Sequence, residues 1–173
     1  YGFPGQFGVS APAGPVTIFL NCDIPMPFYE PWDAGSFAFL SWHFIPSQSN
    51  WQIDVTQGNP LPTAVFTGLP AIQSYDVTLK SVSMPFDPWL CANIYMEFDY
   101  KLADIATGQT EKLTAGYFLD NTWFPVIEFT NAGTTGWLHQ KVDISQVCGN
   151  RIRIGFKVSG ANSSNIERWS VDN

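Results

Sequence analysis

Two carboxylates separated by a single residue, Glu97 and Asp99, come closest by type and spacing to a catalytic pair. Alternate residues of a strand point to the same face, so both side chains are expected to lie together. Glycoside hydrolysis needs such an acid and a second carboxylate at a defined separation. The next residue on that face, however, is Lys101 and not a further acid. We therefore predict that Glu97 and Asp99 are solvated charges paired across strands.

The two histidines, His43 and His139, are the next candidates for chemistry. Both lie in strand-like segments with no nearby Ser or Cys in the Gly-x-Ser-x-Gly context of a nucleophile, and neither has the HExxH spacing of a metalloprotease. We predict ordinary surface or core-edge histidines and no enzymatic activity. A Ser/His/Asp triad assembled from distant segments stays open as an alternative.

The cysteines, Cys22, Cys91 and Cys148, show no CxxC or His-paired spacing, so a zinc site is not expected. An odd number of cysteines allows one disulfide and one free thiol, or three buried thiols. We expect at most one disulfide.

Three of the seven tryptophans are candidates for ligand binding: Trp32, Trp89 and Trp123. Each stands in a Pro-, Asp- or Asn-rich context that is typical of loops. The face of an exposed aromatic ring can stack on the apolar C–H surface of a sugar. The competing interpretation is that these side chains plug the open end of the fold.

The composition limits the classes of partner. Aromatic residues make up 16% and charged residues 13% of the 173, which favours a packed core over a disordered chain. The net charge is −7 and no run of Lys or Arg occurs, so a nucleic-acid partner is not expected. No segment approaches the roughly 20 apolar residues of a membrane-spanning helix, so membrane insertion is not expected either.

Strands, and not helices, are the elements that must position these residues. The chain contains 14 Gly and 13 Pro, which interrupt nearly every window long enough for three helical turns. The spacing of apolar segments and turn signals predicts an all-β sandwich. The predicted strands are residues 16–20, 37–44, 51–55, 75–81, 92–102, 113–119, 126–129, 138–143, 151–158 and 166–171.

Two of these strands alternate clearly. In 92–102 the core positions are expected to be Ile94, Met96, Phe98, Tyr100 and Leu102, with the opposite face in water. In 151–158 the alternation places three cations, Arg151, Arg153 and Lys157, on one face. We predict that this row of cations pairs across strands with Glu97 and Asp99.

Several motifs, taken in order, resemble a known family. They are FYE at 28–30, Trp42, NWQIDVTQGNPLPTAVF at 50–66, YDVTLKS at 75–81, IYMEFDYKL at 94–102, VDIS at 142–145 and GNRIRIGFKVSGANSSNIERWSVDN at 149–173. This succession resembles the MAM-like, cleaved-adhesin or choice-of-anchor modules in secreted surface proteins of Bacteroidetes. The resemblance implies an antiparallel two-sheet jelly-roll β-sandwich over 28–173. The segment 1–27, which is rich in Pro and Gly, is expected to be an irregular arm or edge strand. It also implies that the chain is one part of a longer polypeptide.

The same resemblance implies a calcium ion that holds the N-terminal segment to the last strand. The matching positions are Glu30 and Asp172, with Asp33, Asp120 and Asn173 as possible helpers. Carboxylate and amide oxygens suit this hard cation. The alternative is that these carboxylates cap turns in water.

The function expected first is a non-catalytic, calcium-stabilised adhesion or interaction module of a secreted, cell-surface protein. Its partners would be a cell-surface glycan or protein and the other domains of the same polypeptide. A second hypothesis is a carbohydrate-binding module of a polysaccharide-degrading enzyme. A weaker third hypothesis is a jelly-roll glycosidase.

Overall fold

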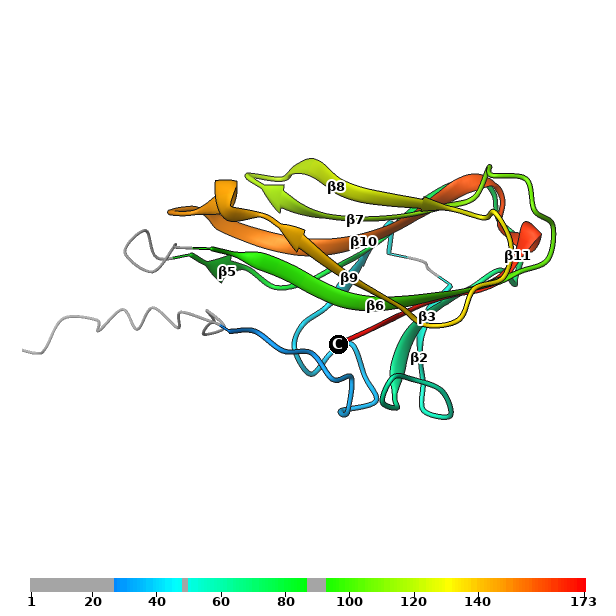
Figure 1. Ribbon diagram of the computed structural model, residues 1–173, viewed down its shortest axis with the longest axis horizontal. Helices are drawn as coiled ribbons and strands as arrows, with labels where there is room; N and C mark the ends of the chain where they lie inside the picture. Colours follow the sequence, from blue (N-terminus) through cyan, green and yellow to red (C-terminus); the bar gives the residue numbers. More distant parts are fainter. Residues whose placement is uncertain (1–26, 48–49, 87–92) are drawn as a thin grey trace, which may run out of the picture.

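The protein is a sandwich of two antiparallel β-sheets. The computed structural model describes residues 27–47, 50–86 and 93–173. Sheet A has the order β1-β4-β10-β7-β8, with β5 pairing β10, and sheet B has the order β2-β3-β11-β6-β9. In Figure 1, β7, β8 and β10 form the upper layer, with β6 and β3 below them. The expected all-β jelly-roll sandwich is confirmed.

The strands of sheet A are β1 (His43–Ile45), β4 (Gln73–Lys80), β5 (Met84–Pro85), β7 (Lys112–Leu119), β8 (Thr122–Thr130) and β10 (Arg151–Asn162). Those of sheet B are β2 (Trp51–Asp54), β3 (Thr63–Thr67), β6 (Tyr95–Asp104), β9 (Leu138–Asp143) and β11 (Ile166–Asp172). Two short 3-10 helices, η1 (Ser145–Val147) and η2 (Ser163–Asn165), lead into β10 and β11. No helix in the described part of the chain is long and apolar enough to cross a membrane.

The core lies between the sheets, where one side of each strand is apolar. The alternation predicted for β6 is confirmed, because Ile94, Met96, Phe98, Tyr100 and Leu102 are all buried. The facing strand β10 contributes Ile152, Phe156 and Val158. Edge-to-face contacts join the two layers, as between Phe98 and Phe156, whose ring centroids are 5.2 Å apart.

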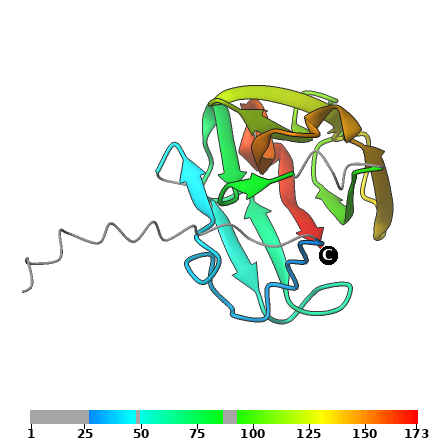
Figure 2. The same ribbon diagram turned by 90° about the vertical axis from the view of Figure 1, so that its left-hand side faces the viewer.

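The segment before β1 packs into this core. Trp32 and Trp42 are 4% and 6% exposed, and their ring centroids lie 5.1 Å apart. The segment also runs beside the C-terminus in both Figure 1 and Figure 2. One contact there is a hydrogen bond from the Tyr29 hydroxyl to Asn173. The beginning of the described chain and its end therefore meet on one side of the molecule.

The predicted strand at 37–44 is wrong for most of its length. Only β1, His43–Ile45, is extended, and the residues before it form turns. The backbone of Ser41 has φ 54°, which an extended strand does not allow. Some of the apolar residues that suggested a strand instead pack inward, as Phe37 does against Trp32, whereas Phe39 is 74% exposed.

Strand β3 was missing from the prediction. It is the central neighbour of β2 and β11, and Thr63, Ala64, Val65 and Phe66 are all buried. A strand buried on both faces shows no alternation of apolar and polar residues, so its period is hidden. The other strand that the prediction lacked, β5, has only two residues. The predicted strand at 16–20 lies outside the described residues, as does nearly all of the expected arm at 1–27.

The predicted pairing of the cations of β10 with Glu97 and Asp99 is also wrong. Strand β10 belongs to sheet A, whereas both acids are on β6 in sheet B. Lys157 instead contacts Asp76 of β4 at 3.0 Å. Glu97 pairs with Lys141 of β9 at 2.6 Å, so the expected cross-strand pairing of this acid is confirmed with a different partner.

Candidate functional site

The outer face of sheet A carries an aromatic surface built from neighbouring strands. Alternate residues of β10 point into the core, namely Ile152, Phe156 and Val158. The outward positions of β10 are therefore those of Arg153, Gly155 and Lys157. The register sets Gly155 opposite Gly116 of β7 and sets Phe118 of β7 opposite Trp123 of β8. Two glycines and two aromatic rings thus occupy adjacent positions on this face.

The six-membered ring of Trp123 lies directly over the two glycines. A Cβ atom added to Gly116 would come within 2.8 Å of Cη2 and 2.9 Å of Cζ2 of Trp123. A Cβ atom added to Gly155 would come within 2.9 Å of Cζ3. Only glycine leaves room for the indole to approach the sheet so closely. Trp123 remains partly exposed, so it presents ring surface to solvent.

Phe118 and two lysines complete the surface around Trp123. The ring centroids of Phe118 and Trp123 are 4.9 Å apart at an interplanar angle of 50°. The Nζ atom of Lys157 lies 5.5 Å from the centroid of Trp123, and that of Lys80 lies 4.3 Å from the centroid of Phe118. We call the group of Lys80, Gly116, Phe118, Trp123, Arg153, Gly155 and Lys157 the sheet A platform.

A surface of this kind is suited to stacking and hydrogen bonding. A flat ring that faces solvent offers apolar area to a sugar, and the lysines beside it are hydrogen-bond donors. The platform contains no carboxylate, histidine or hydroxyl group. Two acids on the same face, Asp76 and Glu128, form ion pairs with Lys157 and Lys112.

The predicted stacking residues differ in where the structure places them. Trp123 lies on the platform. Trp32 is 4% exposed and packs against Phe37 and Trp42, which agrees with the interpretation that it plugs the fold, and its ring is closed to a ligand. Trp89 lies outside the described residues. The other members of the platform were not among the sequence candidates, although Gly155 between Arg153 and Lys157 is a signal for a surface position without a side chain.

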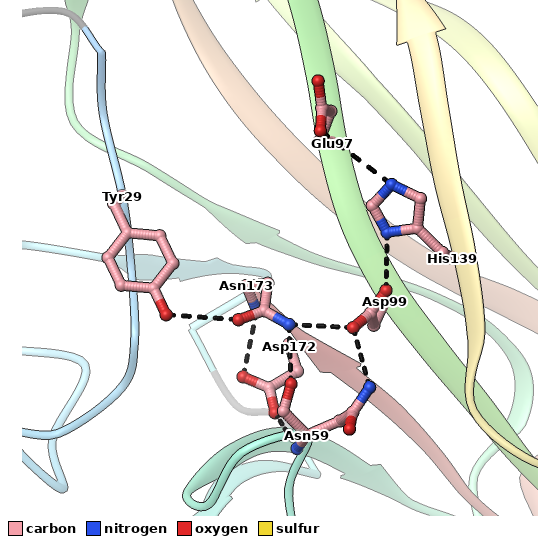
Figure 3. Close-up of polar contacts among 7 residues, drawn as sticks. All are labelled: Tyr29, Asn59, Glu97, Asp99, His139, Asp172 and Asn173. Atoms are coloured by element: carbon pink, nitrogen blue, oxygen red, sulfur yellow. Dashed lines mark hydrogen bonds and ion pairs between the residues drawn. The ribbon is translucent and has the colours of Figure 1, made fainter.

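A second cluster, of polar side chains, lies on the outer side of sheet B (Figure 3). Asp99 of β6 and Asp172 of β11 are register partners and are only 7% and 1% exposed. The loop between β2 and β3 covers them through Asn59, which donates its side-chain amide to Asp99 at 2.9 Å and its backbone N–H to Asp172. The expectation that Asp99 is solvated is wrong because this loop excludes water from it.

Asn173 joins the two carboxylates from the end of the chain. Its side-chain amide donates to Asp99 at 2.8 Å and to the backbone carbonyl of Asn59 at 2.7 Å. Its backbone N–H donates to Asp172 at 2.9 Å. Burial raises the pKa of Asp172 above its ordinary value, the N–H donors oppose this rise, and the negative charges of Asp99 and Asp33 add to it.

His139 of β9 borders this cluster without forming a catalytic triad. Its Nδ1 lies 2.8 Å from Asp99, and its Nε2 lies 3.9 Å from Glu97. The hydrogen-bonded neighbours of the His139–Asp99 pair are Asn59 and Asn173, so no hydroxyl or thiol nucleophile contacts it in the described chain. His139 is a surface histidine, with 59% of its side chain exposed, and the same holds for His43, which is classed as exposed.

The two predicted calcium ligands line one pocket. Glu30, Asp172 and Asn173 all border a space of about 80 Å³ at the end of the sandwich. Glu30 accepts hydrogen bonds from Trp42 Nε1 at 2.7 Å and from the backbone N–H of Trp32 at 3.0 Å. Burial raises the pKa of Glu30, the two hydrogen bonds lower it, and the charge of Asp33 raises it further. The negative charge of Asp33 therefore acts on both predicted ligands.

The helper Asp120 does not belong to this group. It lies in the turn between β7 and β8 of sheet A and does not line the pocket. Within the described ranges, no group of three or more His, Cys, Asp and Glu side chains is arranged to hold a metal ion. A calcium ion bound by Glu30 and Asp172 would therefore need further oxygen ligands from backbone carbonyls, amide side chains or water.

The comparisons with known structures bear on the fold. The K1 cleaved adhesin domain of Lys-gingipain from Porphyromonas gingivalis W83 is similar, with a TM-score of 0.59 and 12% identity over 84% of this chain and 94% of that domain. This chain and that domain therefore share a fold. TmCBM61, solved with β-1,4-galactotriose, matches with a TM-score of 0.51 and 14% identity over 82% of this chain and 90% of the other.

A third similar structure is a carbohydrate-binding module of family 28, described as specific for non-crystalline cellulose, with a TM-score of 0.50 and 12% identity. It covers 87% of this chain and 93% of that module. No family model and no curated protein sequence matches the chain. The cleaved-adhesin part of the expected resemblance thus agrees in fold, while no family match supports the MAM-like or choice-of-anchor part.

Proposed function

We propose that this chain is a non-catalytic binding module whose ligand is a carbohydrate and whose binding surface is the sheet A platform. The observation that carries the proposal is the position of Trp123, whose six-membered ring lies against the paired glycines Gly116 and Gly155. A ring held in this way loses little conformational freedom when a sugar stacks on it. The shared fold with carbohydrate-binding modules supports the same conclusion.

The wider setting that we propose is adhesion at a cell surface by a secreted protein, with other domains on the same polypeptide. The disulfide bond at Cys148 supports an oxidising compartment, because such bonds are rare in the cytosol. A cell-surface glycan is the partner that fits an aromatic platform. A module attached to a polysaccharide-degrading enzyme would use the same platform, so the surface itself is common to both settings.

We also propose that calcium stabilises the module near Glu30 and Asp172. Support comes from the charges around these residues: Asp33 acts on both, and Asp99 acts on Asp172. Burying several carboxylates together without a cation is costly, and a divalent cation would offset that cost. The ion would tie the segment before β1 to the end of β11, next to the contact of Tyr29 with Asn173.

The experiment that tests the carbohydrate proposal is retention of the protein by polysaccharides in gels or pulldowns. The panel includes cellulose, xylan, galactan, mannan and polygalacturonate. Stacking that buries about 80 Å² of ring at about 25 cal/mol/Å² contributes about 2 kcal/mol, so Trp123→Ala should weaken retention about 30-fold.

The matched control is Trp137→Ala. Trp137 is also partly exposed and also has a lysine nearby, with Lys101 Nζ at 6.0 Å from its ring, but it lies beside sheet B. This variant should bind like the unchanged protein. Failure of the unchanged protein to bind any polysaccharide, or equal loss in the two variants, would contradict the proposed function.

A further inference from the structure

The positive charge of this acidic protein is concentrated on one face. Five of the eight Lys and Arg residues lie on outward positions of sheet A, although the net charge of the chain is −7. They are Lys80, Lys112, Arg151, Arg153 and Lys157. The two acids that pair on this face, Asp76 and Glu128, are 60% and 45% exposed and lie toward the end of the platform away from Arg153.

Two of the cations on the platform have no anionic partner among the described residues. Within the described residues, neither Lys80 nor Arg153 forms an ion pair, whereas Lys112 and Lys157 do. Lys80 is only 6% exposed, with its ammonium group 4.3 Å from the ring of Phe118. Burial lowers the pKa of Lys80, and the positive charge of Arg153 lowers it further. An unpaired, largely buried cation beside a second cation favours the approach of an anion.

The register places these cations next to the aromatic rings. Lys80 of β4 is opposite Gly155 of β10, which lies under the ring of Trp123. Arg153 of β10 is opposite Phe118 of β7, which is in turn opposite Trp123 of β8. A sugar ring stacked on Trp123 would therefore lie beside Lys80 and Arg153. A single anionic substituent on that ring could extend toward these cations.

We propose that the ligand of the sheet A platform is an acidic polysaccharide, with a sugar ring on Trp123 and its anionic substituent beside Lys80 and Arg153. This inference rests on the proposed carbohydrate-binding function and deepens it. The stacked ring accounts for recognition of a sugar, and the unpaired cations account for selection of an anionic one. Arg153 offers a planar group of donors that can bind a carboxylate or sulfate with two hydrogen bonds.

The test is affinity electrophoresis of the protein in gels that contain polygalacturonate, dextran sulfate, or a neutral polysaccharide such as hydroxyethyl cellulose or galactan. We expect retention at least tenfold stronger on an acidic polysaccharide than on any neutral one. Retention should weaken severalfold between 50 and 500 mM NaCl, because salt screens exposed charges. Stronger retention on polygalacturonate indicates a carboxylate ligand, and stronger retention on dextran sulfate indicates a sulfate ligand.

The variants are Arg153→Gln and, as the control, Lys101→Gln on sheet B. Arg153→Gln should lose about tenfold in retention on the acidic polysaccharide and much less on a neutral one, while Lys101→Gln should change neither. Arg153 is partly exposed and unpaired, so its replacement should leave the melting temperature unchanged.

The outcomes separate this inference from the proposed function. Retention on a neutral polysaccharide as strong as on any acidic one, lost in Trp123→Ala and kept in Arg153→Gln, would overturn the acidic ligand and leave carbohydrate binding intact. Absence of retention on every polysaccharide would overturn both. The protein could also bind single-stranded DNA as strongly as the acidic polysaccharide. This result would show that the platform binds any anionic ligand with stacking rings, whether or not it is a sugar, and would overturn the inference as well.

Discussion

The carboxylate of Asp172 is buried among other negative charges. It is 1% exposed, shares its surroundings with Asp99, and receives hydrogen bonds from Asn59 and Asn173. The donors favour the ionised carboxylate, but burial and the neighbouring charges outweigh them, so the pKa is raised. Sequence spacing placed Asp172 at the end of a strand, but it could not reveal that a loop more than 100 residues away closes over it.

This raised pKa predicts the direction of a pH effect on stability. A group whose pKa is higher in the folded than in the unfolded state contributes stability below the unfolded pKa, near 3.8, and loses it as pH rises through the folded pKa. In EDTA, the free energy of unfolding of the unchanged protein minus that of Asp172→Asn should therefore fall as pH rises from about 4 to 7.

Urea unfolding at several pH values provides the measurement. Asp143→Asn is the control, since the pKa of Asp143 is lowered by its hydrogen bonds with Ser145 and the trend should have the opposite sign. If the difference in unfolding free energy between the unchanged protein and Asp172→Asn stays constant or rises with pH, the pKa of Asp172 is not raised in the folded state.

Trp32 and Trp123 show how far residue context can predict a binding surface. Both stand near Pro, Asp or Asn, and that context suggested exposed loops for both. Trp32 is in the core, because the segment before β1 folds inward, whereas Trp123 is in strand β8 on the outer face of sheet A. Stacking on Trp123 was thus predicted from its sequence neighbours alone. The two glycines against which its ring lies are on other strands, and the sequence around Trp123 does not reveal which residues the strand register places there.

At the scale of elements, the regular strands were the predictable part. Strand β9 coincides with its predicted range, and β6, β7, β10 and β11 agree within a few residues. Alternation of apolar and polar residues is clear in β6 and β10. The pairing of strands was not predictable. The cations of β10 and the acids of β6 look complementary in sequence, yet the two strands lie in different sheets.

The pairing of β10 with β7 predicts a way to disturb the platform without removing its tryptophan. A Cβ atom at Gly155 would come within 2.9 Å of Trp123, 3.2 Å of Phe118 and 3.3 Å of Thr78, all side-chain atoms. Gly155→Ala should therefore move the indole outward and weaken polysaccharide retention about tenfold, at a cost in stability of about 1–3 kcal/mol.

The control is Gly136→Ala, where an added Cβ atom would meet nothing within 4 Å. Retention in affinity gels and the melting temperature should both match those of the unchanged protein. If Gly155→Ala also binds with unchanged affinity, the close contact of Trp123 with the sheet has no part in binding.

At the scale of the whole molecule, the segment before β1 and the end of β11 are the two parts that calcium would join. An ion that binds only the folded state adds about 2.7 kcal/mol at one hundred times its Kd. For a chain of this size, each kcal/mol moves the melting temperature by roughly 2–4 °C. Saturating calcium should therefore raise the melting temperature by about 5–10 °C over EDTA.

Glu30→Gln and Asp172→Asn should each reduce this calcium response, because each removes a charged oxygen ligand. Asp120→Asn is a matched control, since Asp120 lies in a turn of sheet A away from the pocket. Differential scanning calorimetry of the four proteins measures the effect. A melting curve that EDTA leaves unchanged would contradict the calcium site and leave both carboxylates as hydrogen-bond acceptors of the fold.

The two sheets present different outer faces, and this difference offers the most direct test of the central claim. Sheet A carries the aromatic and cationic platform, and sheet B carries the loop-covered acids with His139 and Glu97 at their border. The measurement is a series of ¹H–¹⁵N spectra of the labelled protein during titration with an oligosaccharide of the polysaccharide that it retains. We predict that the largest shifts occur at the Trp123 side-chain N–H and the backbone amides of Gly116 and Gly155. Shifts concentrated on Glu97, His139 and Lys141 instead would place the ligand on sheet B and contradict the account.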